Sequence, residues 1–446
     1  MSTGRKLRSK LFNLLVSEKT LAATRSFAEK RRRLARRPHV VSVFLELDDP
    51  YSYLLARYLP GLAASYDIEL RYCLTQACAG EDFRPHSGML AAYAEEDCRR
   101  LAAELGVPFL DRGRAPPVEY RRALIDALAA NAHNAKFDDE LLEAISLYWR
   151  GDSEGVARRV SGAVLTGAGD KLLADNQKRL VDLGHYNSAT VHYAGEWYWG
   201  IDRLHYLTER LDALGARREG AKTTGLAAIR QAMHVTLPVA RPSAAKDLPP
   251  LEFFYSFRSP YSYLSAKRVL AIADAFGLQL QIRPVLPMLM RGLQVPRSKL
   301  RYIATDTGRE ARRLDIPYGN FADPLGRGVE RCLAVFIYAK NQKRERDFLL
   351  NAGEAIWARG IDVATDKGMR WVTGRTALFW PDVLAAMQDD GWQRIAEDNR
   401  ESMMESGCWG VPTMRLGDFV VWGQDRDWLL VRHIEEHCDT GDGILV

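Results

Sequence analysis

Two stretches of the chain, near residue 40 and near residue 250, each consist of an apolar run followed by the same short motif, Pro-Tyr-Ser-Tyr-Leu. The runs Val40–Leu47 and Leu251–Phe257 are rich in β-branched and aromatic residues, which is typical of buried strands. A Pro follows each run closely, and apolar residues then recur at helical spacing over Ser52–Ser65 and Ser262–Phe276. We therefore predict a strand followed at once by a helix in both places.

A second strand is predicted after each of these helices, at Glu69–Leu74 and Gln279–Pro284. A strand, a helix and a second strand form a βαβ unit, which implies parallel strands and a right-handed crossover. Long helical stretches follow at 87–184 and 298–406. Each half is then expected to close with a hairpin and a final helix, the hairpin strands being Thr190–Tyr193 with Glu196–Trp199 and Thr413–Leu416 with Phe419–Trp422.

The two halves also share short strings of sequence in the same order. Phe44–Leu54 (FLELDDPYSYL) is a near copy of Phe254–Leu264 (FYSFRSPYSYL). Near the end of each half, Trp199–Arg203 (WGIDR) corresponds to Trp422–Arg426 (WGQDR). Self-similarity kept in order along a chain indicates a tandem duplication, so we predict two homologous α/β domains.

Composition places the protein among ordinary globular proteins. Of its 446 residues, 47% are hydrophobic and 27% are charged, and no apolar run approaches the roughly 20 residues that cross a bilayer. The start lacks the pattern of a secretory signal, so we expect a cytoplasmic protein. Its six cysteines include no C-x-x-C pair, and no His or Cys spacing suggests a metal site.

Positive charge is concentrated in the first 37 residues. This segment carries twelve Lys and Arg against two Glu, whereas the whole chain has a net charge of only +5. Leu11, Phe12, Leu15 and Val16 lie among the basic residues, a pattern that predicts an amphipathic helix followed by a solvated arm. Such a helix could contact an anionic membrane or nucleic acid. We favour a helix that packs on the first domain and presents a polar outer face.

These patterns divide the chain into five parts, including a charged and Pro-rich linker that holds a short helix at Leu226–Met233. The parts are a basic arm (1–37), a first domain (38–207), the linker (208–250), a second domain (251–436) and a C-terminal tail (437–446).

Four motifs of the second half occur together in the order of a known family. They are Ser259–Leu264 (SPYSYL), Gly410–Met414 (GVPTM), Leu416–Asp418 (LGD) and Trp422–Arg426 (WGQDR). Over roughly 250–436 the chain resembles the 2-hydroxychromene-2-carboxylate isomerases and the kappa-class glutathione transferases, within the DsbA-like group. The resemblance implies two tandem thioredoxin-like (DsbA-like) domains, each with a helical insertion, and an enzyme that uses glutathione on a small-molecule substrate.

Ser259 stands where the first strand of this half ends and the helix begins. Free N–H groups and the helix dipole stabilise an anion at such a point. A dithiol oxidoreductase has C-x-x-C here, but this turn reads Ser-Pro-Tyr-Ser, so a thiolate would have to arrive on a ligand. The resemblance supplies glutathione and makes Ser259 the catalytic hydrogen-bond donor to its thiolate. The alternative is that Ser259 is only a helix cap.

The resemblance assigns further residues to glutathione. Val411-Pro412 precedes a strand, and we expect a cis peptide bond that leaves backbone groups for a peptide ligand, with Val411 taking the cysteinyl part. Gln424 and Asp425 are expected to hold the γ-glutamyl end, Asp425 being in any case a suitable helix cap. Lys299 stands where the kappa-class pattern has a lysine for the glycyl carboxylate.

The second half departs from the family pattern at two positions of this turn. Ser256 stands where the isomerases have Asp, and Arg258 replaces an apolar residue. Arg258 would either bind a substrate carboxylate through its fork of N–H groups or be a surface charge. The first half departs further, because it has Asp49 in place of the Ser and Ala189 in place of the Pro. A carboxylate there would repel a thiolate, so we interpret the first half as a degenerate copy.

The function expected from the resemblance is an isomerase in which the glutathione thiolate adds reversibly to an unsaturated carboxylate. One alternative is a kappa-like transferase or peroxidase, and another is a binding or scaffold protein without turnover. Because kappa-like proteins act as dimers, the two halves of this chain would form such a dimer within one molecule.

Overall fold

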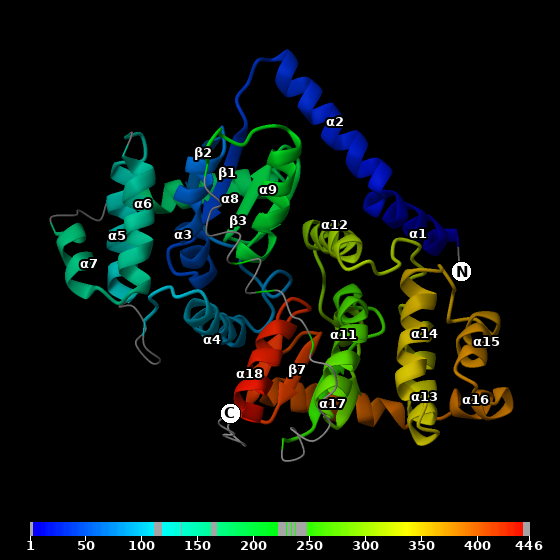
Figure 1. The fold of residues 1–446 in the computed structure, drawn as a ribbon. Coiled ribbons are helices and arrows are strands. Elements are labelled where there is room, and N and C mark those ends of the chain that lie inside the picture. The colour runs from blue at the N-terminus through cyan, green and yellow to red at the C-terminus, as the bar shows by residue number, and fades with distance from the viewer. Residues whose placement is uncertain are drawn as a thin grey trace, which may run out of the picture. The chain divides into compact units, whose positions relative to one another are not determined.

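A computed structural model of the protein describes residues 3–110, 118–134, 136–161, 167–221 and 248–439, together with positions 229, 233 and 237. The chain divides into two compact units (Figure 1). One unit is Ala23–His234, and the other joins Val235–Val446 with the N-terminal segment Met1–Ala22. We call them the first and the second unit, after the half of the sequence that makes up most of each.

The first unit contains a four-stranded sheet in the order β2-β1-β3-β4. Strand β1 runs parallel to β2 and antiparallel to β3, and β3 forms a hairpin with β4. The elements are β1 (Val40–Leu45), α3 (Pro50–Ser65), β2 (Glu69–Leu74), α4 (Ser87–Glu104), α5 (Val118–Ala130), α6 (Phe137–Trp149), α7 (Ser153–Val160), α8 (Ala168–Asp182), β3 (Thr190–Tyr193), β4 (Glu196–Trp199), the short 3-10 helix η1 (Ile201–Arg203) and α9 (Leu204–Ala213).

The second unit has the same strand arrangement, in the order β6-β5-β7-β8. Strand β5 is parallel to β6 and antiparallel to β7, which pairs with β8. The elements are β5 (Leu251–Tyr255), α11 (Pro260–Phe276), β6 (Leu280–Pro284), η2 (Met288–Arg291), α12 (Arg297–Arg313), α13 (Arg327–Asn341), α14 (Glu345–Trp357), α15 (Asp366–Arg375), α16 (Trp380–Ala386), α17 (Trp392–Glu405), β7 (Thr413–Leu416), β8 (Phe419–Trp422) and α18 (Asp427–Asp439).

The first inner strand of each sheet, β1 or β5, is buried over all or nearly all of its length, which explains its apolar run. All five residues of β5 are buried, and the helix that follows it, α11, packs against α12, α14 and α18. An α/β fold with helices covering a mixed sheet is therefore present in both units, as the sequence predicts.

Matching side-chain contacts brace the first helix of each sheet. Tyr53 on α3 donates its hydroxyl hydrogen bond to the carbonyl of Pro108, and Tyr263 on α11 donates to the carbonyl of Pro317 at 2.8 Å. Together with the shared strand order, these contacts support the hypothesis of a tandem duplication.

The basic arm differs from its prediction. It forms two helices, α1 (Thr3–Val16) and α2 (Glu18–Leu34), and α1 packs on α12 of the second unit, not on the first domain. Phe12 of α1 contacts the rings of Phe321 and Trp357, with centroids 4.8 and 6.1 Å away. Amphipathicity predicts that one face of a helix is covered, but it does not name the partner, and so the wrong domain was chosen.

Two predicted boundaries also shift. Helix α9 continues past residue 207 to Ala213, and Arg217 donates to the Tyr66 hydroxyl at 2.8 Å, so the first unit extends into the predicted linker. The short helix expected at Leu226–Met233 lies largely outside the described residues. Helix α18 ends at Asp439, and the rest of the expected tail also lies outside them. Within the described residues, none of the helices has the length and apolar character needed to cross a bilayer.

Candidate functional site

The turn between β5 and α11 is built around Ser259. Ser259 is the N-cap of α11, with extended backbone angles, and Pro260 occupies the first helical position. Its hydroxyl oxygen accepts a hydrogen bond from Ser262 N at 3.2 Å and donates to the carbonyl of Val411 at 3.4 Å. The capping role weighed from sequence is thus present, and a long, weak hydrogen bond is all that occupies the hydroxyl proton.

The loop before β7 brings Val411 and Pro412 to this turn. The Val411–Pro412 peptide bond is cis, as the sequence predicts. The carbonyl of Pro412 accepts from Gly423 N at 2.9 Å, which ties the loop to the end of β8. A side chain at Gly410 would collide with the ring of Trp422, so only glycine fits this approach. Sequence reasoning therefore brought Ser259, Val411 and Pro412 together correctly.

No cysteine of the described chain lies in this turn. Cys408 is three residues before Val411, but it is fully buried. Thiol chemistry at Ser259 would therefore need a thiol carried by a ligand.

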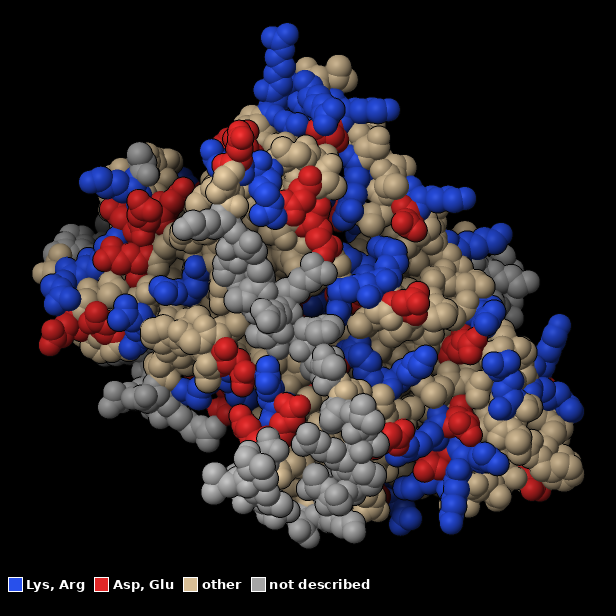
Figure 2. Space-filling model, in the orientation of Figure 1, with Lys and Arg blue, Asp and Glu red and all other residues tan. Residues whose placement is uncertain are grey.

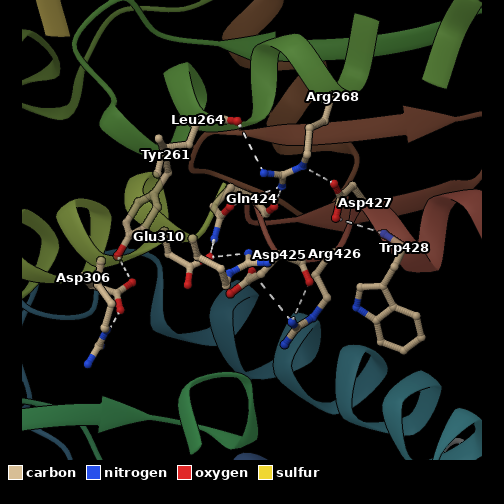
Figure 3. A network of polar contacts seen from close by, with 12 residues as sticks. Tyr261, Leu264, Arg268, Asp306, Glu310, Gln424, Asp425, Arg426, Asp427 and Trp428 are labelled. Atoms are coloured by element: carbon tan, nitrogen blue, oxygen red, sulfur yellow. Dashed lines mark hydrogen bonds and ion pairs between the residues drawn. The ribbon is translucent and has the colours of Figure 1, made fainter. Parts of the chain in front are cut away.

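Gln424 and Asp425 follow β8 (Figure 3), and they differ in exposure. The Gln424 side chain is buried, donates to Glu310 Oε2 at 2.7 Å and accepts from Arg268 at 3.2 Å. Its side-chain amide thus bonds to other protein groups, and any hydrogen bond from Gln424 to a ligand would come from its backbone. Asp425 is partly exposed, with 26% of its side chain accessible, and lies 3.7 Å from Arg426 Nη1.

The loop that holds these residues is fixed by Arg268 of α11. Arg268 forms an ion pair with Asp427 at 2.5 Å and also donates to the Gln424 carbonyl. On α12, Asp306 accepts from the Tyr261 hydroxyl at 2.8 Å. Partly buried polar contacts therefore join α11 to α12 and to the start of α18, and they position the loop that carries Asp425.

Two cations lie against Trp409, at the start of the cis-proline loop. The Lys299 ammonium is 5.6 Å from the centroid of the Trp409 ring, and burial lowers the pKa of Lys299 to about 8. Arg291 donates two hydrogen bonds to the carbonyl of Trp409 at 3.2 and 3.3 Å, and burial lowers its pKa to about 10. Sequence reasoning found Lys299 through the resemblance but missed Arg291, which lies in no motif.

Arg258 differs from its expected role. Its guanidinium makes a fork-like pair with Asp323, with Nε–Oδ1 and Nη2–Oδ2 distances of 2.8 and 3.1 Å. Asp323 is buried and also accepts from Leu325 N. Arg258 therefore forms an ion pair within the protein. Its guanidinium is not open to a substrate carboxylate in the way that the sequence suggested.

The first unit has a carboxyl pair at its corresponding turn. Asp49 caps α3 by accepting from Ser52 N at 3.1 Å, and both Asp49 and Glu46 accept from the Ser188 hydroxyl, at 3.2 and 2.6 Å. Both carboxyls are buried. Burial, followed by the charge of Asp49, raises the pKa of Glu46 to about 7, and burial also raises that of Asp49. Sequence reasoning found Asp49 but missed Glu46 and Ser188.

A possible metal-binding group lies on the closing helix of the second unit. Ligand atoms of His433, Glu436 and His437 on α18 lie within 4.8 Å of one another. The sequence analysis expected no metal site, and the spacing His-x-x-x-His on one helix face was the signal that could have pointed to this group.

A cis-proline loop facing the first helix of a β-α-β, β-β-α sheet defines the thioredoxin-like class of proteins. Residues 250–435 match the family model described as a DSBA-like thioredoxin domain.

Curated relatives of the chain include two proteins named 2-hydroxychromene-2-carboxylate isomerase. The protein from Sphingobium xenophagum is 24% identical over 40% of this chain and 93% of its own length. That from Pseudomonas putida is 25% identical over 42% of this chain and 95% of its own length. A solved structure of 2-hydroxychromene-2-carboxylate isomerase is similar with 23% identity and a TM-score of 0.38, covering 43% of this chain and 96% of that one.

Proposed function

We propose that the second unit is a glutathione-dependent isomerase that acts on an unsaturated aromatic carboxylate of the 2-hydroxychromene-2-carboxylate class. The observation that carries the proposal is the Ser259 hydroxyl at the N-terminus of α11, opposite the cis Val411–Pro412 bond, in a turn without cysteine. Curated relatives that match about two fifths of this chain are named for that isomerisation.

The residues present fit glutathione. The backbone beside Val411 and Pro412 would pair with the cysteinyl part, and Asp425 would hold the α-amino group of the γ-glutamyl end. Lys299, which lies over the Trp409 ring, would attract the glycyl carboxylate, and so would Arg291, which holds the Trp409 carbonyl. When bound, glutathione would supply a thiolate that adds to the conjugated double bond and is later eliminated, so that none is consumed.

Ser259 would act on the charge of that thiolate. Its hydroxyl proton would turn from the Val411 carbonyl toward the sulfur, while its oxygen keeps the hydrogen bond from Ser262 N. The N–H groups and dipole of α11 favour a negative charge at the same point. Both effects lower the free energy of the thiolate relative to the thiol, which raises the fraction of the nucleophile at neutral pH.

Arg258 already donates two hydrogen bonds to Asp323, so a cation other than Arg258 would have to bind the substrate carboxylate. Because Asp323 neutralises that guanidinium, we assign Arg258 to holding the loop before α13 against the Ser259 turn. Replacing Asp323 with Asn would release the arginine, and we expect it to change the KM for the substrate more than the affinity for glutathione.

The test is to follow 2-hydroxychromene-2-carboxylate by its ultraviolet spectrum with the full chain and a substoichiometric amount of glutathione. We expect equilibration that requires glutathione and leaves its concentration unchanged. Loss of glutathione in step with the substrate would instead identify a transferase or peroxidase. A rate equal to that without protein would leave a binding or scaffold role.

A further inference from the structure

Helix α1 has two opposite faces with different surroundings. Its inner face is fixed to the second unit, where Val16 is buried and Asn13 accepts from Phe321 N at 2.9 Å. The carbonyl of Val16 also accepts from Arg312 of α12 at 3.0 Å. The inner face is therefore already occupied, and the helix is held in a defined orientation.

The outer face of α1 is apolar and exposed. Leu7, Leu11 and Leu14 have 59%, 58% and 61% of their surface accessible. At 100° per residue these three positions span only about 60° of the helix circumference, opposite Val16. We call Leu7, Leu11 and Leu14 the outer stripe. The polar outer face that the sequence analysis favoured is therefore not found.

Helix α2 repeats the feature. Phe27 and Leu34 are seven residues apart, on one side of the helix, with 69% and 86% of their surface accessible. Among the described residues, eleven large hydrophobic side chains are exposed, and five of them lie in the first 37 residues. Scattered single apolar residues need no explanation, but a concentration of this kind marks an interaction surface.

Positive charge accompanies this apolar surface. Lys10 is exposed beside the outer stripe, and Lys30 and Arg31 are exposed beside Phe27 and Leu34. The segment 1–37 carries a net charge of +10. Figure 2 shows Lys and Arg side chains gathered at the C-terminal end of α2, at the top of the view.

We propose that the outer stripe of α1 binds the surface of an anionic lipid bilayer. Interfacial helices use an apolar stripe that enters the acyl boundary together with flanking cations that contact anionic headgroups. Nucleic acid fits less well, because phosphates are bound by charge and bases by aromatic stacking, and exposed leucines serve neither.

The experiment is flotation of the full chain with vesicles of phosphatidylcholine, with and without about a third of phosphatidylserine. We expect binding to the anionic vesicles that weakens in high salt, because screening shortens the reach of the charges. Replacing Leu7, Leu11 and Leu14 with Ser should lower the partition coefficient at least tenfold, because the apolar area that enters the lipid is lost. A matched control with Val181, Phe379 and Leu384 replaced by Ser, all exposed elsewhere, should bind like the natural chain.

Far-ultraviolet circular dichroism and glutathione titration show whether the stripe variant is folded, and the single change Leu11→Glu serves if it is not. Vesicle binding that ignores the stripe substitutions would overturn the proposal, as would no binding to either vesicle. Binding of a labelled DNA duplex without vesicle binding would replace it with a nucleic-acid role. A chain that is dimeric in light scattering, and monomeric only in the stripe variant, would show the stripe to be a contact between copies.

Discussion

The Ser259 hydroxyl makes two hydrogen bonds of different strength. The bond that it accepts from Ser262 N caps α11, and the longer bond that it donates to the Val411 carbonyl is easily exchanged. A serine in this arrangement can cap the helix and meet a ligand at the same time. The two roles are therefore separable only by comparison with a serine or threonine that has the first role alone.

Thr365 offers that comparison, because it caps α15 by accepting from Gly368 N at 3.1 Å. We expect Ser259→Ala and Thr365→Ala each to cost about 1 kcal/mol in the free energy of unfolding, the usual cost of losing a cap. Only Ser259→Ala should also raise the pKa of bound glutathione, measured from the ultraviolet absorbance of the thiolate. Equal thiol pKa values in both variants would show that Ser259 is a cap and nothing more.

Lys299 predicts a pH dependence. Burial lowers its pKa to about 8, so the ammonium loses its proton as the pH rises through 8 and its attraction for a carboxylate disappears. We expect the affinity for S-methylglutathione, which has no thiol to titrate, to fall above pH 8 in calorimetric titrations. Lys299→Met should bind more weakly at pH 7 and lose this dependence, and a profile unchanged by the substitution would remove Lys299 from the site.

Residue roles were predictable from sequence only where neighbours in the chain decide them. The cap at Ser259 and the turn at Val411 follow from local sequence. The partner of Arg258 does not, because Asp323 lies far along the chain and meets it only through the packing of the helical insertion. The same holds for the Ser188 hydroxyl, which donates to Glu46 and Asp49 although it lies about 140 residues further along the chain.

At the scale of elements, the strand-to-helix turns of the two units differ in chemistry. The turn of the second unit holds the Ser259 hydroxyl, whereas that of the first unit holds the buried carboxyls of Glu46 and Asp49. Such a pair is stable when one carboxyl is protonated and donates to its surroundings, and less stable when both are charged. The turn between β1 and α3 is therefore sensitive to pH, and the turn between β5 and α11 has no such pair.

This difference predicts local stability. Because the pKa of Glu46 is raised to about 7, the folded unit holds a proton that the unfolded chain releases near pH 4.5. The contribution of Glu46 to stability is therefore fully present below pH 4.5 and is lost between about pH 4.5 and 7. We expect a loss of about 3 kcal/mol across this window. Hydrogen exchange of 40–65 should accelerate accordingly, with 251–276 as an internal control. Glu46→Gln should flatten the profile, and an unchanged slope in that variant would contradict the account.

Element boundaries were predicted well where turn residues lie close to both ends of a strand. The four hairpin strands and β2 match their predicted bounds, whereas the buried strands β1 and β5 each end two residues before their predicted end. The partner of α1 could not be predicted, because its inner face shows only that something covers it. The outer stripe also escaped notice, since leucines on both faces of a helix look like a single core pattern in sequence.

At the scale of the whole molecule, the predicted duplication raises the hypothesis that the two halves replace the two subunits of a dimer. That hypothesis predicts a monomer of 50.3 kDa in size-exclusion chromatography with light scattering. A stable species of twice that mass would show that other contacts drive assembly.

Glutathione binding to the full chain, measured by calorimetric titration, tests the central claim most directly. We predict saturable binding at one site per chain, weakened at least tenfold in Asp425→Ala because a charge-assisted hydrogen bond to the γ-glutamyl end is lost, and unchanged in Asp418→Ala, which alters an exposed turn of the same unit. The absence of binding to the natural chain, or equal binding in both variants, would contradict the assignment of this unit to glutathione.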